Sequence, residues 1–263
     1  MHNLILQKLR IAIQDKLILK DFSLNVKQND VVALMGPNGA GKSTLFKAIM
    51  HHFNVRQLKG RVSYDGHNLN DKSTDEIAKL GIFYATQNPT ELDGVQMLEF
   101  LKLISNQSHA EHTPFYQLFT SINQTLKTLD LPSEILSRNV NVGFSGGQKK
   151  KSEILQAQLF DPSLILLDEI DSGLDIDATK IIANFINQRR KKSITLVISH
   201  NVEFLELLKP NKVIILANGE IAKTGNQSLI KKIESLGFKP FIKNVQADED
   251  FTKEDPFLTC NRR

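Results

Sequence analysis

The sequence predicts an α/β domain in which helices cover a largely parallel β-sheet. Three observations support this fold class: continuous apolar runs at residues 31–35, 164–167, 194–198 and 213–216, a glycine-rich loop directly after the first run, and apolar residues at helical spacing between the later runs. Apolar runs without alternation are typical of strands buried on both faces, and such strands need helices above and below them. We therefore expect strands and helices to alternate around one sheet.

The composition is that of a chain without membrane-spanning segments. Of its 263 residues, 41% are hydrophobic and 24% are charged. No apolar run approaches the roughly 20 residues of a membrane-spanning helix. The first apolar stretch ends at Leu6, just before Lys8, which is too short for a secretory signal. The single cysteine, Cys260, cannot form an internal disulfide, so we expect a cytoplasmic protein with no direct membrane insertion.

Nucleic acid is not among the expected partners. The formal net charge of +4 is only mildly basic. The run Arg189-Arg190-Lys191-Lys192 follows an amphipathic segment, and cations are favourable at the C-terminus of a helix. No nucleic-acid-binding motif interleaves aromatic residues with these charges.

Two shorter segments precede the first buried run. Residues 5–13 and 17–26 have the pattern of strands with a turn at Gln14-Asp15 between them, which predicts a small antiparallel sheet. A helix over residues 42–53 is expected after the glycine-rich loop.

A helical insertion is expected in the middle of the chain. Residues 98–159 have largely helical periodicity, with a polar loop at residues 106–114. The segment is longer than a crossover between neighbouring strands requires. Residues 244–263 are rich in charge, and the sequence leaves open whether they form a free tail or contact a partner. The predicted division is one domain over residues 1–243 and a tail over residues 244–263. Within the domain, the core and the β subdomain take residues 1–86 and 163–243, and the helical subdomain takes residues 87–162.

The glycine-rich loop at residues 36–43 matches the phosphate-binding pattern GxxxxGK[ST], between a predicted strand and a predicted helix. Its glycines let successive backbone N–H groups wrap a triphosphate. Lys42 is expected to neutralise the β- and γ-phosphates, and the Ser43 hydroxyl to bind Mg²⁺. The ATP-binding residues expected here are Gly36, Pro37, Asn38, Gly39, Ala40, Gly41, Lys42, Ser43 and Thr44.

Two acidic residues, Asp168 and Glu169, follow the apolar run at residues 164–167. A carboxylate at the end of this strand lies where Mg²⁺ is needed, so Asp168 is expected on the metal side. Glu169 is then placed to polarise the attacking water. A solvated turn is the alternative interpretation of two adjacent acids.

A Ser-Gly-Gly-Gln turn at residues 145–148, the signature turn, opens a predicted helix 23 residues ahead of Asp168. Lys149, Lys150 and Lys151 follow it, although cations at a helix N-terminus oppose the helix dipole. We expect them to be tolerated because this end faces an anion, the γ-phosphate held by a second copy of the chain.

From residue 1 to about residue 240, the order of these motifs resembles that of ATP-binding cassette (ABC) ATPases. The resemblance implies their fold: a P-loop core of the RecA type, an N-terminal antiparallel β subdomain and an inserted helical subdomain. It also implies ATP hydrolysis with Mg²⁺. By this resemblance, Gln87 joins Mg²⁺ and water to the helical subdomain, and His200 contacts the γ-phosphate. The implied catalytic residues are Glu169, His200 and Gln87, and the implied Mg²⁺ ligands are Ser43, Gln87 and Asp168.

The same resemblance implies that two copies of the chain close face to face on ATP. The family usually has an aromatic residue in the first hairpin that stacks on adenine. The matching residue here is Ile13, so stacking is weaker or replaced by ordinary apolar contact. The residues expected to act across the dimer are Ser145, Gly146, Gly147, Gln148 and Asp175.

Within this superfamily, residues 137–151 and 168–178 resemble the SufC family, the ATPases of the SUF iron–sulfur cluster assembly system. Transporter cassettes typically have Leu-Ser-Gly-Gly-Gln and Glu-Pro-Thr-Ser-Ala-Leu-Asp at these places. Residues 87–95 also resemble the SufC family, whereas Gln148 departs from it, because that family often has Glu there. The resemblance implies scaffold partners of SufB and SufD type, docked on the helical subdomain and on the Q-loop, the segment that begins at Gln87. With one cysteine, the chain has no set of thiolates to hold iron.

Other functions compete with this one. The nucleotide-binding subunit of an ABC transporter shares the same cassette core. A module that holds ATP only as a structural ligand is disfavoured by Glu169 and His200. A chromosome or translation ATPase is disfavoured because the chain has neither a second cassette nor a long coiled coil.

Overall fold

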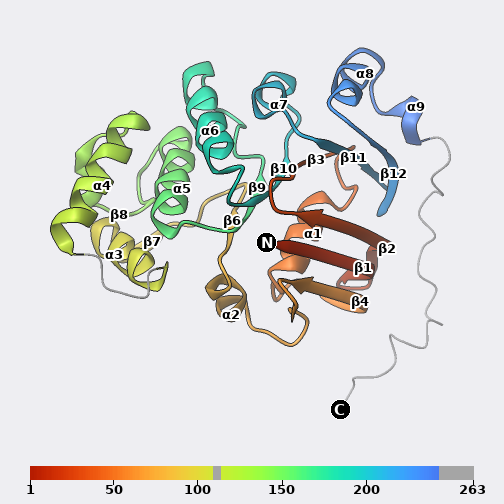
Figure 1. Cartoon of the computed structure of the whole chain (residues 1–263), viewed down its shortest axis with the longest axis horizontal. Coiled ribbons are helices and arrows are strands. Elements are labelled where there is room, and N and C mark those ends of the chain that lie inside the picture. Colours follow the sequence, from red (N-terminus) through yellow and green to blue (C-terminus); the bar gives the residue numbers. More distant parts are fainter. Residues whose placement is uncertain (109–113, 243–263) are drawn as a thin grey trace.

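The computed structural model of the chain describes residues 1–108 and 114–242 (Figure 1). Cys260 and the predicted tail at residues 244–263 lie outside the described residues. Within the described residues, one sheet has six strands in the order β12-β11-β3-β10-β9-β6. Neighbouring strands run parallel except at the β11–β12 pair, which is antiparallel. Their bounds are Val31–Met35 for β3, Ile82–Ala85 for β6, Leu164–Asp168 for β9, Ile194–Ile198 for β10, Lys212–Ala217 for β11 and Glu220–Gly225 for β12.

The strands of this sheet are buried on both faces, as their apolar runs predict. Every residue of β3, β9 and β10 is buried. In β3, Val31, Ala33 and Met35 contribute to one hydrophobic cluster, whereas Val32 and Leu34 contribute to the other. Successive side chains of a strand point to opposite faces, so this alternation places one apolar layer on each side of the sheet. The predicted fold class, a largely parallel sheet covered by helices, is confirmed.

A second sheet covers one face of the core, with the order β2-β1-β4-β5. The predicted N-terminal antiparallel pair is present, and β4 and β5 extend it. Gly60 in β4 has φ +95°, and a Cβ there would lie 2.4 Å from the backbone oxygen of Gln7. Only glycine therefore lets β4 come this close to β1. The strand bounds are Asn3–Ile13 for β1, Lys16–Lys27 for β2, Arg56–Tyr64 for β4 and His67–Asn68 for β5.

The helices surround these sheets. Helix α1 (Lys42–Ile49) ends four residues before the predicted position 53, because the chain turns at His51, whose φ is +50°. Helix α5 (Gly146–Phe160) begins directly after the signature turn's serine. The remaining bounds are Thr74–Lys79 for α2, Ile176–Arg189 for α6, Val202–Leu208 for α7, Ser228–Leu236 for α8 and Lys239–Ile242 for α9.

Helices α3 (Met97–Ser108), α4 (Phe115–Thr128) and α5 gather at one end of the molecule, to the left in Figure 1. The predicted loop at residues 106–114 is wrong in part, because α3 continues to Ser108; residues 109–113 lie outside the described residues. A two-stranded ladder of β7 (Leu92–Gln96) and β8 (Asn139–Val140), with a 3₁₀ turn at Ser133–Ser137, was not predicted. The boundaries proposed for this helical subdomain stay a prediction.

No helix among residues 1–108 and 114–242 is both long enough and apolar enough to cross a membrane.

Candidate active site

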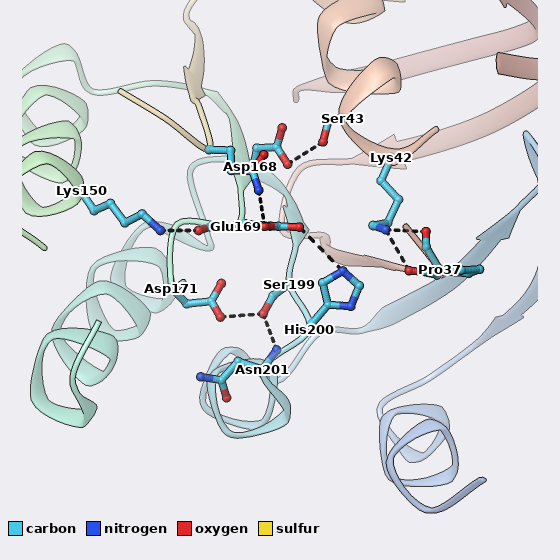
Figure 2. A network of polar contacts seen from close by, with 12 residues as sticks. Pro37, Lys42, Ser43, Lys150, Asp168, Glu169, Asp171, Ser199, His200 and Asn201 are labelled. Atoms are coloured by element: carbon cyan, nitrogen blue, oxygen red, sulfur yellow. Dashed lines mark hydrogen bonds and ion pairs between the residues drawn. The ribbon is translucent and has the colours of Figure 1, made fainter. Parts of the chain in front are cut away.

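The carboxyl ends of three neighbouring parallel strands, β3, β10 and β9, meet at one edge of the central sheet. The loop at residues 36–43 follows β3, Glu169 follows β9, and Ser199 and His200 follow β10. Ligand sites of open α/β sheets lie at this edge. Figure 2 shows how the polar side chains from these loops converge on one another.

The glycine loop has the shape that phosphate binding requires. Gly36 has φ +147°, and a Cβ there would lie 2.0 Å from the backbone oxygen of Leu216. Gly39 and Gly41 have φ +79° and +101°, and a Cβ on Gly39 would meet nothing within 4 Å. Asn38 and Gly39 form the exposed tip, whereas Ala40 and Thr44 are buried.

Lys42 lies over this loop at the start of α1. Its Nζ donates to the backbone oxygens of Gly36 at 2.8 Å and Pro37 at 2.9 Å (Figure 2). Burial lowers the pKa of Lys42, and the nearby carboxylates Glu169 and Asp168 oppose that shift. No acidic residue lies in the first turn of α1, and its N-cap Gly41 offers no side-chain acceptor. The helix N-terminus and a buried ammonium group thus fit an anion such as phosphate.

Asp168 and Ser43 fit a hard cation. Asp168 is 2% exposed, and its Oδ1 accepts a hydrogen bond of 2.9 Å from the Ser43 hydroxyl. Its Oδ2 accepts one of 3.0 Å from the Tyr84 hydroxyl. Burial raises the pKa of Asp168, and these two hydrogen bonds oppose the rise. In the described part of the chain, no cluster of three His, Cys, Asp or Glu side chains could hold a metal. A carboxylate and a hydroxyl beside a phosphate loop suit Mg²⁺, which keeps several waters and takes phosphate oxygens.

Glu169, Gln87 and His200 meet, although they are far apart in sequence. Oε2 of Glu169 accepts a hydrogen bond of 2.6 Å from Nε2 of Gln87. Oε1 of Glu169 lies 3.7 Å from Nε2 of His200. Glu169 has a left-handed backbone, with φ +51°. Burial and the charge of Lys42 lower the pKa of His200, which favours the neutral imidazole. The structure thus brings these three predicted side chains to one place, while their catalytic roles stay predictions.

Two positioning contacts were missed by sequence reasoning. Oδ2 of the buried Asp171 accepts a hydrogen bond of 2.9 Å from the Ser199 hydroxyl. The Ser199 oxygen in turn accepts one of 2.9 Å from the backbone N–H of Asn201. This chain ties the segment after β9 to the segment that carries His200 (Figure 2). The second missed contact is that of Tyr84 with Asp168.

The signature turn caps α5. The Ser145 oxygen accepts a hydrogen bond of 3.2 Å from the backbone N–H of Gln148, whose side chain accepts one of 3.0 Å from the Ser145 N–H. A Cβ on Gly146 would meet nothing within 4 Å, and one on Gly147 would lie 3.6 Å from Leu174. Asp175 caps α6, since its Oδ1 accepts a hydrogen bond of 2.7 Å from the Ala178 N–H. Their action across a dimer stays a prediction.

Each of the three lysines of α5 has a partner within the chain, which the sequence did not predict. Nζ of Lys149 lies 2.6 Å from Glu91, and that of Lys151 lies 3.8 Å from Asp130. Lys150 is buried and donates to the backbone oxygens of Glu169 at 2.8 Å and Ser172 at 2.5 Å. These contacts offset charge at this end of the helix, and the γ-phosphate of a second copy as a further counter-charge stays a prediction.

Ile13 lies at the tip of the β1–β2 hairpin, paired with Lys16. A Cβ on Gly41 would lie 2.8 Å from Leu19 of β2, so this hairpin packs directly against the glycine loop. That placement brings Ile13 to the same side of the molecule as the loop. Its contact with an adenine base stays a prediction.

A cavity of about 570 Å³ opens beside the metal side of the site. Ser43, Tyr84, Gln87 and Asp168 are among the residues that line it. Further lining comes from α3, α5 and β6, through Phe100, Ile104, Gln156, Phe160 and Phe83. The cavity therefore connects the helical end of the molecule to the candidate metal ligands.

Comparison with known proteins identifies the family. Residues 19–172 match the family model described as ABC transporter. The chain is 41% identical over 240 residues to the "Probable ATP-dependent transporter ycf16" of Trieres chinensis, covering 89% of this chain and 95% of the relative. It is 36% identical over 252 residues to "Vegetative protein 296" of Bacillus subtilis strain 168, covering 95% and 96%.

Solved structures agree with this assignment. The structure described as "ATP binding subunit of ABC transporter" superposes with a TM-score of 0.75 at 26% identity, covering 89% of this chain and 93% of the other. The dimeric cassette MJ0796 bound to ADP and Pi has a TM-score of 0.74 at 21% identity, covering 85% and 98%, and shows the shared fold. The ABC fold expected from the sequence is thereby confirmed. The chain belongs to the ABC transporter family and is an ABC-type ATPase, which binds and hydrolyses ATP.

Proposed function

We propose that this ATPase drives a conformational change in a SUF-type iron–sulfur cluster assembly complex, with Mg²⁺ as its metal ion. The supporting observation is the segment at residues 168–175, which resembles the SufC family. Asp171 stands in it where transporter cassettes typically have threonine. That carboxylate is buried and bonded to Ser199, beside His200. The SUF-like residue is therefore part of the site's own hydrogen-bond network.

Each group of the site has a proposed task. Ser43, Asp168 and Gln87 hold Mg²⁺, which offsets phosphate charge when bound. Lys42 binds the β- and γ-phosphates, and Glu169 accepts a proton from the attacking water. Neutral His200 donates a hydrogen bond to the γ-phosphate. In the present arrangement Gln87 already holds the Glu169 carboxylate at 2.6 Å, so the Q-loop sets the position of the base.

A second copy of the chain completes the site. The capping box fixes the N-terminus of α5, where the backbone N–H groups of Gly146 and Gly147 suit an anion. The open space at Gly146 leaves room for a phosphate to approach the backbone. The proposal is supported by the dimeric state of MJ0796 with ADP and Pi. In this dimer the signature turn and Asp175 of one copy close over the ATP of the other.

The proposed docking surface for SufB/SufD-type scaffold proteins is the cavity of about 570 Å³. It is partly apolar, through Phe83, Phe100 and Phe160, which suits a protein segment. Gln87 and Asp168 also line it. A scaffold segment bound there would contact the residues that hold the metal and the base.

One alternative keeps support from the comparisons. Relatives carry the names "Probable ATP-dependent transporter ycf16" and "Probable ABC transporter ATP-binding protein SpyM3_0208", the latter at 38% identity over 236 residues in Streptococcus pyogenes. By that alternative, the chain is the nucleotide-binding subunit of an ABC transporter, and a membrane subunit binds the same cavity.

Affinity purification of the tagged chain from its native cells distinguishes the two functions. The SUF function predicts co-purification of cluster-scaffold proteins. Asn88→Arg, which adds bulk and charge at an exposed position of the cavity wall, should reduce their recovery at least tenfold. Leu236→Arg, 61% exposed on α8, introduces the same residue elsewhere and should leave recovery unchanged. Recovery of membrane permeases alone would establish the transporter function instead.

A further inference from the structure

Tyr84 lies in the central sheet and packs against the first helix. It lies in β6, which pairs with β9 in parallel so that Tyr84 is opposite Leu166, two residues before Asp168. Its ring meets that of Phe46 in α1 edge to face, with centroids 6.0 Å apart and an interplanar angle of 83°. This packing against Phe46 constrains the direction of its hydroxyl.

That hydroxyl donates to Oδ2 of Asp168 at 3.0 Å. An ionised carboxylate only accepts hydrogen bonds, so the phenol must be the donor. The other oxygen, Oδ1, accepts the bond from Ser43 at 2.9 Å. Both oxygens of this buried carboxylate are therefore held by hydroxyl groups, one from β6 and one from α1.

The two hydroxyl groups stand in different relations to the metal. The Ser43 oxygen is itself a proposed Mg²⁺ ligand, and it would bind the cation through a lone pair while its O–H can still donate to Oδ1 of Asp168. Tyr84 lies on the opposite oxygen, so its hydrogen bond persists. Of the two hydroxyl contacts to Asp168, it is therefore the one made by a group outside the proposed metal ligands.

We propose that Tyr84 is a positioning residue for the metal site: its hydroxyl holds Oδ2 of Asp168 so that Oδ1 faces Ser43 and the cation. This inference rests on the magnesium site proposed above. Groups that orient a metal ligand through a hydrogen bond typically change metal affinity by about 10- to 100-fold when they are removed. The hydroxyl of Tyr84 is such a group, because it is hydrogen-bonded to the proposed ligand Asp168.

The chain provides a matched control. Tyr64 in β4 is buried, and its hydroxyl donates to Oγ of Ser163 at 2.7 Å. Ser163 lies just before β9, whereas Asp168 ends that strand. Tyr84→Phe and Tyr64→Phe therefore remove the same atom from a hydrogen-bonded tyrosine at opposite ends of one strand.

The experiment measures Mn²⁺ binding by electron paramagnetic resonance, with the full chain and a non-hydrolysable ATP analogue. We expect the Kd of Mn²⁺ to rise about tenfold in Tyr84→Phe and to stay at the wild-type value in Tyr64→Phe. In EDTA, a fluorescent ATP analogue should bind all three proteins equally, because the glycine loop is untouched. Equal metal-free binding shows that the variant is folded.

Each outcome bears on a different claim. Wild-type affinity for Mn²⁺ in Tyr84→Phe overturns the role of Tyr84 and leaves the magnesium site standing. A similar loss in Tyr64→Phe also overturns it, since the effect would then be general to buried tyrosines. If the wild-type protein binds no Mn²⁺ with the analogue, the magnesium site and the role of Tyr84 fail together.

Discussion

The glycine loop and the signature turn both suit phosphate, but they are built differently. The loop at residues 36–43 is fixed by long-range contacts: Gly36 packs on β11, Lys42 faces two carboxylates, and Ser43 bonds to Asp168 across 125 positions. The signature turn at residues 145–148 is fixed mainly by itself, through the capping box of Ser145 and Gln148. The glycine loop is thus a nearly complete phosphate site within one chain. Among the residues that the structure describes, the signature turn is an ordered surface without such long-range hydrogen bonds, which agrees with the proposal that it binds ATP held by a second copy.

Lys150 connects the two regions. It lies in the second turn of α5, and its Nζ reaches the backbone oxygen of Glu169 (Figure 2) and that of Ser172. Burial lowers the pKa of Lys150, and the charges of Asp171, Glu153 and Glu169 oppose that shift. Through these two hydrogen bonds, α5 is joined directly to the segment that carries the proposed base, Glu169.

The largest expected effect lies in the complete site. Glu169→Gln should lower kcat for ATP hydrolysis by about 10³-fold, because the general base is lost while the glycine loop is intact. ATP binding should persist, and the variant should accumulate as a closed dimer in light scattering with Mg-ATP. Glu234→Gln, an exposed position on α8, is the control. A monomeric Glu169→Gln protein under saturating Mg-ATP would contradict the shared site.

The connection between the two regions should be the next most sensitive point. Lys150→Met leaves two carbonyl oxygens without their donor, and each unpaired buried polar group costs about 1–3 kcal/mol. We expect the free energy of unfolding in urea to fall by about 2–3 kcal/mol. Lys149→Met removes only a surface ion pair with Glu91 and should cost less than about 1 kcal/mol. Equal losses in the two variants would show that α5 is not anchored through Lys150.

Glu153 makes the same helix sensitive to pH. It is buried in α5, accepts a hydrogen bond of 3.3 Å from the Thr86 N–H next to Gln87, and burial raises its pKa to about 8. Between pH 4.5, the ordinary pKa of a glutamate, and about pH 8, Glu153 thus keeps its proton in the folded state and loses it in the unfolded state. The contribution of Glu153 to stability is therefore fully present below pH 4.5 and is lost as the pH rises through about 8.

Glu153→Gln tests this sign, because an amide keeps the shape without the ionisation. At pH 8 the variant should be more stable than the wild-type protein by more than about 1 kcal/mol, since one pKa unit corresponds to about 1.4 kcal/mol. Urea unfolding between pH 5 and 8 should show a smaller decline in the variant. Parallel pH profiles for the two proteins would rule out the buried proton on Glu153.

The smallest expected change in stability concerns the caps. Ser145→Ala and Ser73→Ala each destroy a capping box, at the start of α5 and of α2, and each should cost about 1 kcal/mol in unfolding free energy. Only Ser145→Ala should also abolish ATP-dependent dimerisation, measured by light scattering in the Glu169→Gln background. If both caps, or neither, affect dimerisation, the signature turn has no special part in it.

The sequence predicts well where one local pattern determines the structure. The buried strands are apparent because both of their faces are apolar, and the glycine loop and Asp168 follow from their place after such strands. Strand β4 was missed because it mixes charges with glycine, and β7 because most of its residues are exposed. Asp171, Lys150 and Tyr84 escaped because their partners come from distant segments, which no local spacing reveals. Gln87 and His200 were found through the family resemblance, since nothing in their immediate neighbours marks them.

Tyr84 has two surroundings at once: its hydroxyl touches Asp168, and its side chain is part of the wall of the large cavity. Anything seated in that cavity consequently borders both the acid at the end of β9 and the aromatic ring that holds it.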